Sequence, residues 1–363
     1  MPTVRAANLL RQSAVLLCAA LLTLQGCGNS GNKPSAGAAG DSSTAGGNTG
    51  QAHGAGGAVV GLVFDIGGRG DKSFNDAAYT GLERARTELG TNYTTLETSE
   101  GADREAQLRQ LAAGDAQIIF GVGFLFTDDI KTLAREFPGK KFACVDFTVA
   151  ANETLPPNLL ALKFKEEEGA YLVGALAALL SKTHKVGFVG GMQIPLIQKF
   201  QAGFVAGARA VDPQCVVLVK YAGNTGAAFK DPTKGKELAL AEYQGGADII
   251  FHASGSTGLG VFEAARELKK LAIGVDSDQY AEAPGFILTS MVKRVDTAVF
   301  DAIRDYKAGT FHGGVRELGL ADDGVRWVYD EHNKPLIPAA VKARVDALQA
   351  DIIAGKIHVP THP

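Results

Sequence analysis

A turn rich in glycine follows the first apolar segment of the chain, at a place where side chains could bind a small molecule. Three glycines lie between residues 67 and 70, with Asp65 before them and Phe74 and Asn75 after them. In open α/β sheets, ligands bind at the carboxyl ends of the strands. An acid, an aromatic ring and an amide at this edge could together recognise a flat, polar molecule.

The same turn lacks the pattern of a phosphate-binding loop. That pattern requires Gly directly before Lys, and here Asp71 precedes Lys72. A carboxylate at this place repels phosphate, which argues against a P-loop. A second glycine-rich turn, at 255–260, also misses the dinucleotide spacing G-x-G-x-x-G. It still offers a flexible backbone before a helix, where polar ligand atoms bind.

The chain carries no motif typical of a hydrolase or a metal enzyme. H-E-x-x-H, paired C-x-x-C and G-x-S-x-G are absent from the sequence, and its 7 histidines are scattered. His252 lies in an apolar run, so we expect a core residue rather than a ligand. We therefore expect no catalytic residues, no metal and no cofactor, and a protein that is not an enzyme.

Polar residues also follow other apolar runs. Asp146 closes the predicted strand 141–146, and Asp276 and Lys293 follow the predicted strands 271–275 and 286–292. The backbone of Gly255 follows the predicted strand 248–253. Taken alone, an acid after a strand is most often a solvated turn residue or a helix cap. Phe74 or Phe229 alone is most often a core side chain. Because the carboxyl ends of parallel strands share one edge, the residues together predict a pocket with aromatic walls and few polar groups.

Strand-like and helix-like segments alternate from residue 59 onward, which predicts a parallel α/β architecture. The predicted strands are 59–64, 93–97, 117–121, 141–146, 159–164, 185–190, 216–221, 248–253, 271–275 and 286–292. The predicted helices include 74–89, 127–136, 166–182, 196–211, 232–244, 258–270 and 295–308. A capping box of Ser73 and Asp76 is expected to begin the first helix. Helix 166–182 is apolar but too short to span a bilayer, so we expect it to be buried.

A faint repeat relates the two halves of this alternation. Val60-Gly61 recurs as Val186-Gly187, and Phe74 recurs as Phe200, both at an offset of 126 residues. The shared strand–turn–helix context predicts two similar α/β lobes with a cleft between them. We expect lobe one at 58–163 plus 290–318, and lobe two at 164–289 plus 319–358.

The first residues have the layout of an export signal. Arg5 and Arg11 precede an apolar core that is too short to be a membrane-spanning helix, so residues 1–26 are expected to be removed. The ending Leu24-Gln25-Gly26-Cys27 resembles a bacterial lipobox, in which the cysteine is lipidated. An ordinary cleaved signal is the alternative. Residues 27–57 would then be the lipidated Cys27 and a flexible Gly/Ser/Ala tether.

The composition is that of a soluble globular protein. The 363 residues suffice for two domains, and 46% of them are hydrophobic and 21% charged. Without Arg5 and Arg11 the 36 basic residues become 34 against 39 acidic ones, a net charge of −5. This balance gives no reason to expect nucleic acid as a partner. Cys144 and Cys215 lie in or beside apolar runs, so we expect buried free thiols.

Three separated motifs resemble the basic membrane protein (BMP) family of substrate-binding lipoproteins of ABC transporters, typified by a bacterial purine nucleoside receptor. They are Gly-Asp-Lys-Ser-Phe-Asn at 70–75, Gly-Val-Asp-Ser-Asp-Gln-Tyr at 274–280, and Leu-Thr-Ser-Met-Val-Lys-Arg at 288–294. The similarity covers nearly all of 58–358. It implies a type I periplasmic-binding-protein fold, with the ligand cleft between two lobes. It also implies an exported, lipid-anchored monomer that delivers a nucleoside, expected to be a purine nucleoside, to permease and ATPase subunits.

The resemblance also implies a role for each candidate residue. Phe74 and Phe229 would sandwich the base, and Asn75 and Asp146 would hydrogen-bond its edge. Asp276 and Lys293 would hold the ribose hydroxyls, with the backbone at Gly255 assisting and Asp65 lining the same end. Three alternatives stay open: a nucleoside-processing enzyme such as a hydrolase, a signalling receptor, and a sugar-binding receptor of the same fold.

Overall fold

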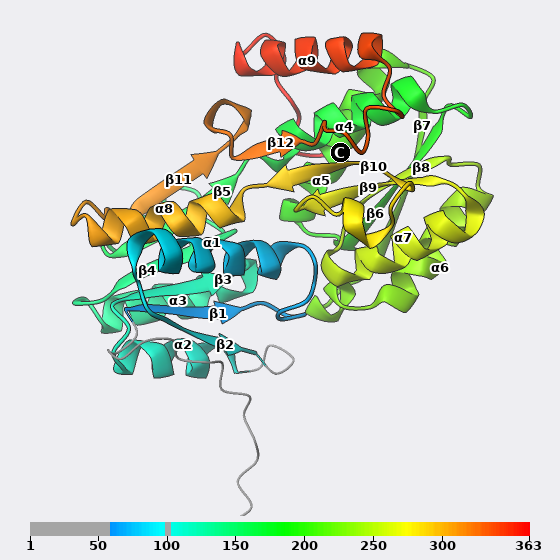
Figure 1. Ribbon diagram of the computed structural model, residues 1–363. Helices are drawn as coiled ribbons and strands as arrows, with labels where there is room; N and C mark the ends of the chain where they lie inside the picture. The colour runs from blue at the N-terminus through cyan, green and yellow to red at the C-terminus, as the bar shows by residue number, and fades with distance from the viewer. Residues whose placement is uncertain (1–58, 99–102) are drawn as a thin grey trace, which may run out of the picture. The chain divides into compact units, whose positions relative to one another are not determined.

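The computed structural model describes residues 59–98 and 103–363. The predicted signal peptide at 1–26, the lipidation at Cys27 and the tether at 27–57 lie outside the described residues. The described chain forms two six-stranded sheets with helices packed on them (Figure 1).

The first sheet has the strand order β11-β5-β4-β3-β1-β2, and all its neighbouring strands are parallel. Its strands are β1 (Val60–Phe64), β2 (Tyr93–Glu97), β3 (Ile118–Val122), β4 (Lys141–Val145), β5 (Leu159–Phe164) and β11 (Gly314–Leu318). Helices α1 (Phe74–Leu89) and α8 (Val295–Lys307) pack on one face, and α2 (Arg104–Ala113) and α3 (Thr127–Glu136) on the other. Because both faces are covered, β1 and β3 are buried along their whole length, which explains their continuous apolar sequence.

The second sheet has the order β12-β10-β9-β8-β6-β7. Its strands are β6 (Lys185–Met192), β7 (Val216–Gly223), β8 (Ile249–Ala253), β9 (Leu271–Asp276), β10 (Ile287–Lys293) and β12 (Val325–Trp327). Its helices are α4 (Glu166–Leu180), α5 (Pro195–Val211), α6 (Pro232–Gln244), α7 (Gly258–Leu268) and α9 (Ala339–Ile353). All strand pairs are parallel except that β12 runs antiparallel to β10.

The two sheets share one strand order. Strand β1 holds the place in the first sheet that β6 holds in the second, and β3, β4 and β5 correspond in the same way to β8, β9 and β10. The prediction of an α/β protein with two similar parallel sheets is therefore confirmed. The predicted free thiols are confirmed as well, since Cys144 and Cys215 are both buried and unbridged.

Helix α4 is buried over most of its length, as predicted, because α5 packs against it at short range. A Cβ atom at Gly203 would lie 2.1 Å from the Glu167 carbonyl oxygen, and one at Gly207 would lie 1.9 Å from that of Tyr171. Only glycine permits this approach of the two backbones. In the described part of the chain, no helix combines the length and apolar character needed to cross a membrane.

The chain passes between the sheets three times: from β5 to α4, from β10 to α8, and from β11 to β12. Strand β10, which contains the predicted lobe boundary at residue 290, pairs with β9 from Ile287 to Val292. The second crossing therefore follows Lys293. The division of the chain into two lobes with the predicted bounds remains a prediction.

Candidate ligand-binding site

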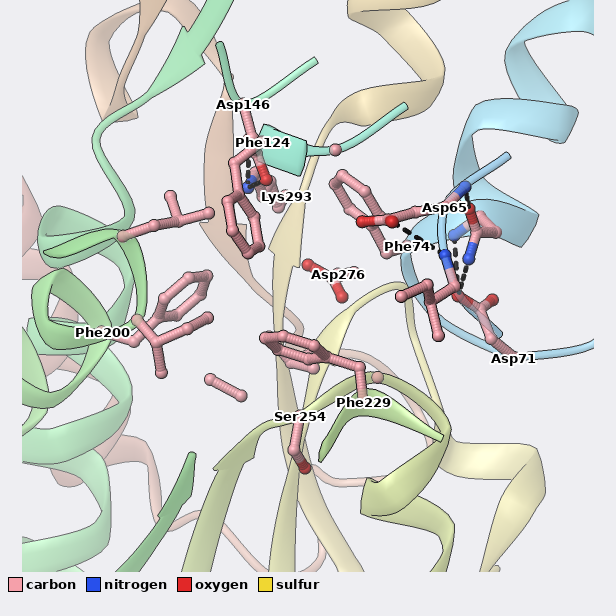
Figure 2. A pocket seen from close by; sticks show the side chains of 18 residues that line it. Asp65, Asp71, Phe74, Phe124, Asp146, Phe200, Phe229, Ser254, Asp276 and Lys293 are labelled. Atoms are coloured by element: carbon pink, nitrogen blue, oxygen red, sulfur yellow. Dashed lines mark hydrogen bonds and ion pairs between the residues drawn. The ribbon is translucent and has the colours of Figure 1, made fainter. Parts of the chain in front are cut away.

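A cavity lies where strands from both sheets end, and all the predicted site residues line it (Figure 2). These residues are Asp65, Phe74, Asn75, Asp146, Phe229, Gly255, Asp276 and Lys293. The empty space, counted out to its opening, is about 580 Å³.

Asp71, which lines the cavity beside these residues, organises the turn between β1 and α1. Its buried carboxylate accepts hydrogen bonds from the backbone amides of Ser73 (3.0 Å), Asn75 (2.8 Å) and Asp76 (3.1 Å). Asp71 thus caps α1, and the predicted capping box is wrong. The Ser73 hydroxyl makes no cap and instead donates to Asp276 of the second sheet at 2.5 Å.

Asn75 joins the two acids of this turn. Its side-chain oxygen accepts the Asp65 amide at 2.9 Å, and its Nδ2 donates to Asp71 at 3.1 Å. An asparagine amide has two N–H donors, so one is left for a ligand. Burial raises the pKa of the Asp65 carboxyl to about 7, although the Ile66 amide and Arg104 oppose the shift.

Asp146 and Asp276 occupy equivalent positions at the carboxyl ends of β4 and β9. Both have left-handed backbones, with φ of 61° and 64°. This conformation is uncommon outside glycine and is best tolerated by Asp and Asn. Each sheet thus presents one carboxylate to the cavity, and both residues have the same unusual backbone conformation. Backbone strain of this kind clusters at functional sites.

Lys293 supplies a buried cation to this cavity. Its Nζ lies 2.6 Å from Oδ1 of Asp146 and 3.0 Å from Oε1 of Glu166. The ammonium also lies 5.2 Å from the ring centroid of Phe74 and 5.8 Å from that of Phe200, distances suited to cation–π attraction. Burial alone would lower the pKa of Lys293, but the surrounding carboxylates outweigh it and raise the pKa. Lys293 is therefore charged.

Asp276 is held in the cavity wall by its hydrogen bond from Ser73. Burial raises the pKa of its carboxyl to about 7, with Lys293 and the Ser73 hydroxyl opposing the shift. Near neutral pH the Asp276 carboxyl is thus close to half-protonated. It can accept a hydrogen bond in one form and donate one in the other.

Phe229 reaches the cavity from the short helix η2 (Gly226–Phe229). Its ring packs on the backbone of Gly191, where a Cβ atom would lie 2.2 Å from the ring. Its carbonyl oxygen accepts the Ser256 hydroxyl at 3.2 Å, next to Gly255, whose φ is 56°. The ring meets Phe124 edge-on at 6.4 Å between centroids.

Sequence reasoning missed several residues that line the cavity: Asp71, Phe124, Leu196, Ile197 and Phe200. Phe200 carried a signal, because it repeats Phe74 at the offset of 126 residues, and both rings line the cavity. Phe124 begins the short helix η1 (Phe124–Phe126) after β3, in the place that Gly255 holds in η3 (Gly255–Thr257) after β8. The equivalence of the two strands could have indicated Phe124.

His252 lies behind the cavity wall and is a core residue, as predicted. It is fully buried, lies 3.0 Å from Gln279 Oε1, and has its pKa lowered to about 4 by burial. Among residues 59–98 and 103–363, no cluster of His, Cys, Asp or Glu could hold a metal ion. The cavity is thus suited to binding a molecule with flat and hydroxylated parts.

Comparison with known proteins agrees with this geometry. Residues 58–362 match the family model Bmp, described as ABC transporter substrate-binding protein PnrA-like. The chain belongs to the Bmp family. This family consists of substrate-binding proteins of ABC transporters.

Individual relatives cover most of the chain. A CD4+ T-cell-stimulating antigen of Listeria monocytogenes is 38% identical, over 84% of this chain and 88% of the relative. An ABC transporter nucleoside-binding protein, BmpA, of Lactococcus lactis is 34% identical, over 83% of this chain and 88% of the relative. A solved ABC transporter solute-binding protein of Aeropyrum pernix is 30% identical with a TM-score of 0.76, over 83% of this chain and 93% of that one. The predicted type I periplasmic-binding-protein fold is therefore confirmed.

Proposed function

We propose that this Bmp protein is an exported lipoprotein that captures a nucleoside and delivers it to the permease and ATPase of an ABC transporter. The observation that carries the proposal is the cavity itself, which combines aromatic rings, hydrogen-bonding carboxylates and a buried ammonium. The name of the Lactococcus relative, a nucleoside-binding protein, supports the same ligand class. We further propose that the base is a purine and that the protein is not an enzyme.

The aromatic side of the cavity is suited to a base. Phe74 and Phe229 reach it from different sheets, and we assign them to the two faces of the base. Offset stacking adds about 0.5–1.5 kcal/mol per pair beyond area burial. The free N–H of Asn75, with Asp146 nearby, would hydrogen-bond the edge of the base.

The charged side of the cavity is suited to a ribose. Asp276 and Lys293 can accept from and donate to vicinal hydroxyls, and the backbone at Gly255 lies beside them. A hydrogen bond to a charged group contributes about 1.5–3 kcal/mol. Among the described residues, four aspartates line the cavity and Lys293 is the one lysine or arginine that does so. A neutral nucleoside is therefore favoured over a nucleotide.

Mass spectrometry of ligand that co-purifies with the protein tests the proposal directly, and a nucleoside is the expected result. Phe74→Ala should lower the affinity for that nucleoside roughly tenfold or more in calorimetric titration, because the ring loses both its stacking and its apolar contact. Phe137→Ala is the control, since Phe137 packs on the core of the first sheet away from the cavity.

The alternatives give different results in the same experiments. Tight binding of free ribose by the parent protein, unaffected by Phe74→Ala, would indicate a sugar receptor. Release of free base with time would indicate a hydrolase. Nucleoside uptake that does not depend on the protein would leave a signalling receptor as the better assignment.

A further inference from the structure

Lys293 belongs to a chain of four buried or half-buried ion-paired side chains that extends away from the cavity. Beyond Lys293, the second oxygen of Glu166 lies 2.9 Å from Nζ of Lys199 on α5. The sequence of groups is Asp146, Lys293, Glu166 and Lys199, with charges that alternate in sign. We call these residues the ion-pair chain.

Glu166 is the central link of the ion-pair chain. It is 0% exposed and begins α4 directly after the first crossing between the sheets, while Lys293 precedes the second crossing. Burial opposes its ionisation, but Lys293 and Lys199 outweigh burial and lower the pKa of Glu166. A buried carboxylate between two ammonium groups holds both of them in place, because either cation would otherwise be buried without full compensation.

Lys199 fixes Glu166 from the far side. Its Nζ also donates to the carbonyl oxygen of Phe164 at 2.6 Å, so its position is set by the backbone at the end of β5. Glu167 contacts Lys199 at 3.4 Å but is not among the carboxylates paired with Lys293. Glu166 therefore contacts a residue that lines the cavity, Lys293, whereas the neighbouring Glu167 does not.

An ammonium group has three N–H donors. The Lys293 ammonium donates a hydrogen bond to Oδ2 of Asp146 at 2.7 Å, and Oε1 of Glu166 faces it at 3.0 Å as an ion pair without a hydrogen bond. N–H donors of Lys293 are therefore left for the cavity, and the charge of Glu166 acts on their direction. Without Glu166, the ammonium would be free to turn toward Asp146 and away from a bound molecule.

We propose that Glu166 is a positioning residue: supported by Lys199, it orients the Lys293 ammonium toward the hydroxyl groups of the ligand. This inference rests on the proposed function, since it assigns Lys293 to a ribose. Glu166 itself would not contact the ligand and would act only through Lys293.

Calorimetric titration of Glu166→Gln with a nucleoside and its 2′,3′-dideoxy analogue tests the proposal. Affinity for the nucleoside should fall about ten- to a hundredfold, the range expected for one hydrogen bond to a charged group. Affinity for the dideoxy analogue should change little, because that analogue makes no hydroxyl contact with Lys293. Glu166→Gln/Lys199→Met removes one charge of each sign and should show the same split if the single variant folds poorly.

Glu167→Gln is the matched control and should bind both ligands like the parent. Equal loss of both ligands in Glu166→Gln would show a general structural role and overturn the proposal. Parent-like affinity for both would overturn it as well.

An NMR measurement on the ligand-free protein tests the role of Glu166 independently of whether the protein binds a nucleoside. In the parent protein, the Lys293 ammonium should give a slowly exchanging ¹⁵Nζ NMR signal, assigned by its absence from Lys293→Met. Glu167→Gln should keep this signal and Glu166→Gln should lose it. If the parent binds no nucleoside, this pattern still supports positioning by Glu166, whereas an unchanged signal in Glu166→Gln overturns it.

Discussion

At the scale of single residues, Glu242 of α6 shows how strongly burial can change an acid. Its carboxyl lies against β6, where the absence of a side chain at Gly187 makes room for it. Both carboxyl oxygens are buried without a hydrogen-bond partner among the described residues. Burial therefore raises the pKa of Glu242 from 4.5 to about 9, with Lys220 opposing the shift only in part.

This shift predicts a pH-dependent stability. The folded protein keeps the Glu242 proton between pH 4.5 and about 9, whereas the unfolded chain loses it, so the free energy of unfolding falls as pH rises through this range. Glu242→Gln should remove this dependence and raise the free energy of unfolding at pH 8 by on the order of 5 kcal/mol. Denaturant titrations at pH 5 and pH 8 measure it.

Glu237→Gln on the same helix is the control, because Glu237 is exposed and paired with Lys234. It should behave like the parent at both pH values. If Glu242→Gln raises the free energy of unfolding equally at pH 5 and at pH 8, the Glu242 carboxyl is not protonated in the folded protein.

The sequence indicated Asp65, Asp146, Asp276 and Lys293, because strand ends can be read from apolar runs. It did not indicate partners that depend on the distance between the two sheets. The Ser73 hydroxyl was expected at its own helix, yet Asp71 takes the helix amides and leaves Ser73 for Asp276. Glu166 was likewise not indicated, because its pairing with Lys293 depends on contacts between residues that are distant in the sequence.

At the scale of elements, β6 and η2 together place one wall of the cavity. The Phe229 ring occupies the space beside Gly191 in β6, and the backbone at Gly191 has no positive φ that would exclude a side chain. Gly191→Ala should therefore displace the ring without straining the strand. Nucleoside affinity should fall roughly 3- to 10-fold, the value of one stacking contact, in calorimetric titration.

Gly139→Ala provides the control for this prediction. A Cβ atom at Gly139 meets nothing within 4 Å, so ligand affinity and thermal stability should match the parent. Unchanged affinity of Gly191→Ala would mean that Phe229 does not stack on the ligand.

The central elements of both sheets were predictable, because strands covered on both faces have continuous apolar sequences. Strands β11 and β12 and helices α2 and α9 were not among the predicted segments. β11 alternates between half-buried and exposed residues at an edge, and β12 has only 3 residues. Such strands take their structure from the neighbour with which they pair rather than from their own sequence.

At the scale of the whole molecule, two sheets with one topology contribute different chemistry to one cavity. Asp146 and Asp276 are equivalent in position and in backbone conformation, yet Asp146 pairs with Lys293 while Asp276 binds Ser73. Phe164 ends β5 where Lys293 ends β10, and the ring of the first lies 5.0 Å from the ammonium of the second. A repeat that has diverged in this way can bind a ligand with one aromatic and one hydroxylated side.

The proposed lipid attachment of this protein to a membrane can be tested at Cys27. The lipobox-like ending Leu24-Gln25-Gly26-Cys27 predicts an acyl group there, so Cys27→Ser should move the protein from the membrane to the soluble fraction of a bacterial host. Cys18→Ser, within the leader, should stay lipidated. Ligand affinity should be the same in both variants, because the cavity is lined by residues from 65 onward. Intact-mass measurement decides the matter: an unchanged acyl mass on Cys27→Ser would place the modification elsewhere.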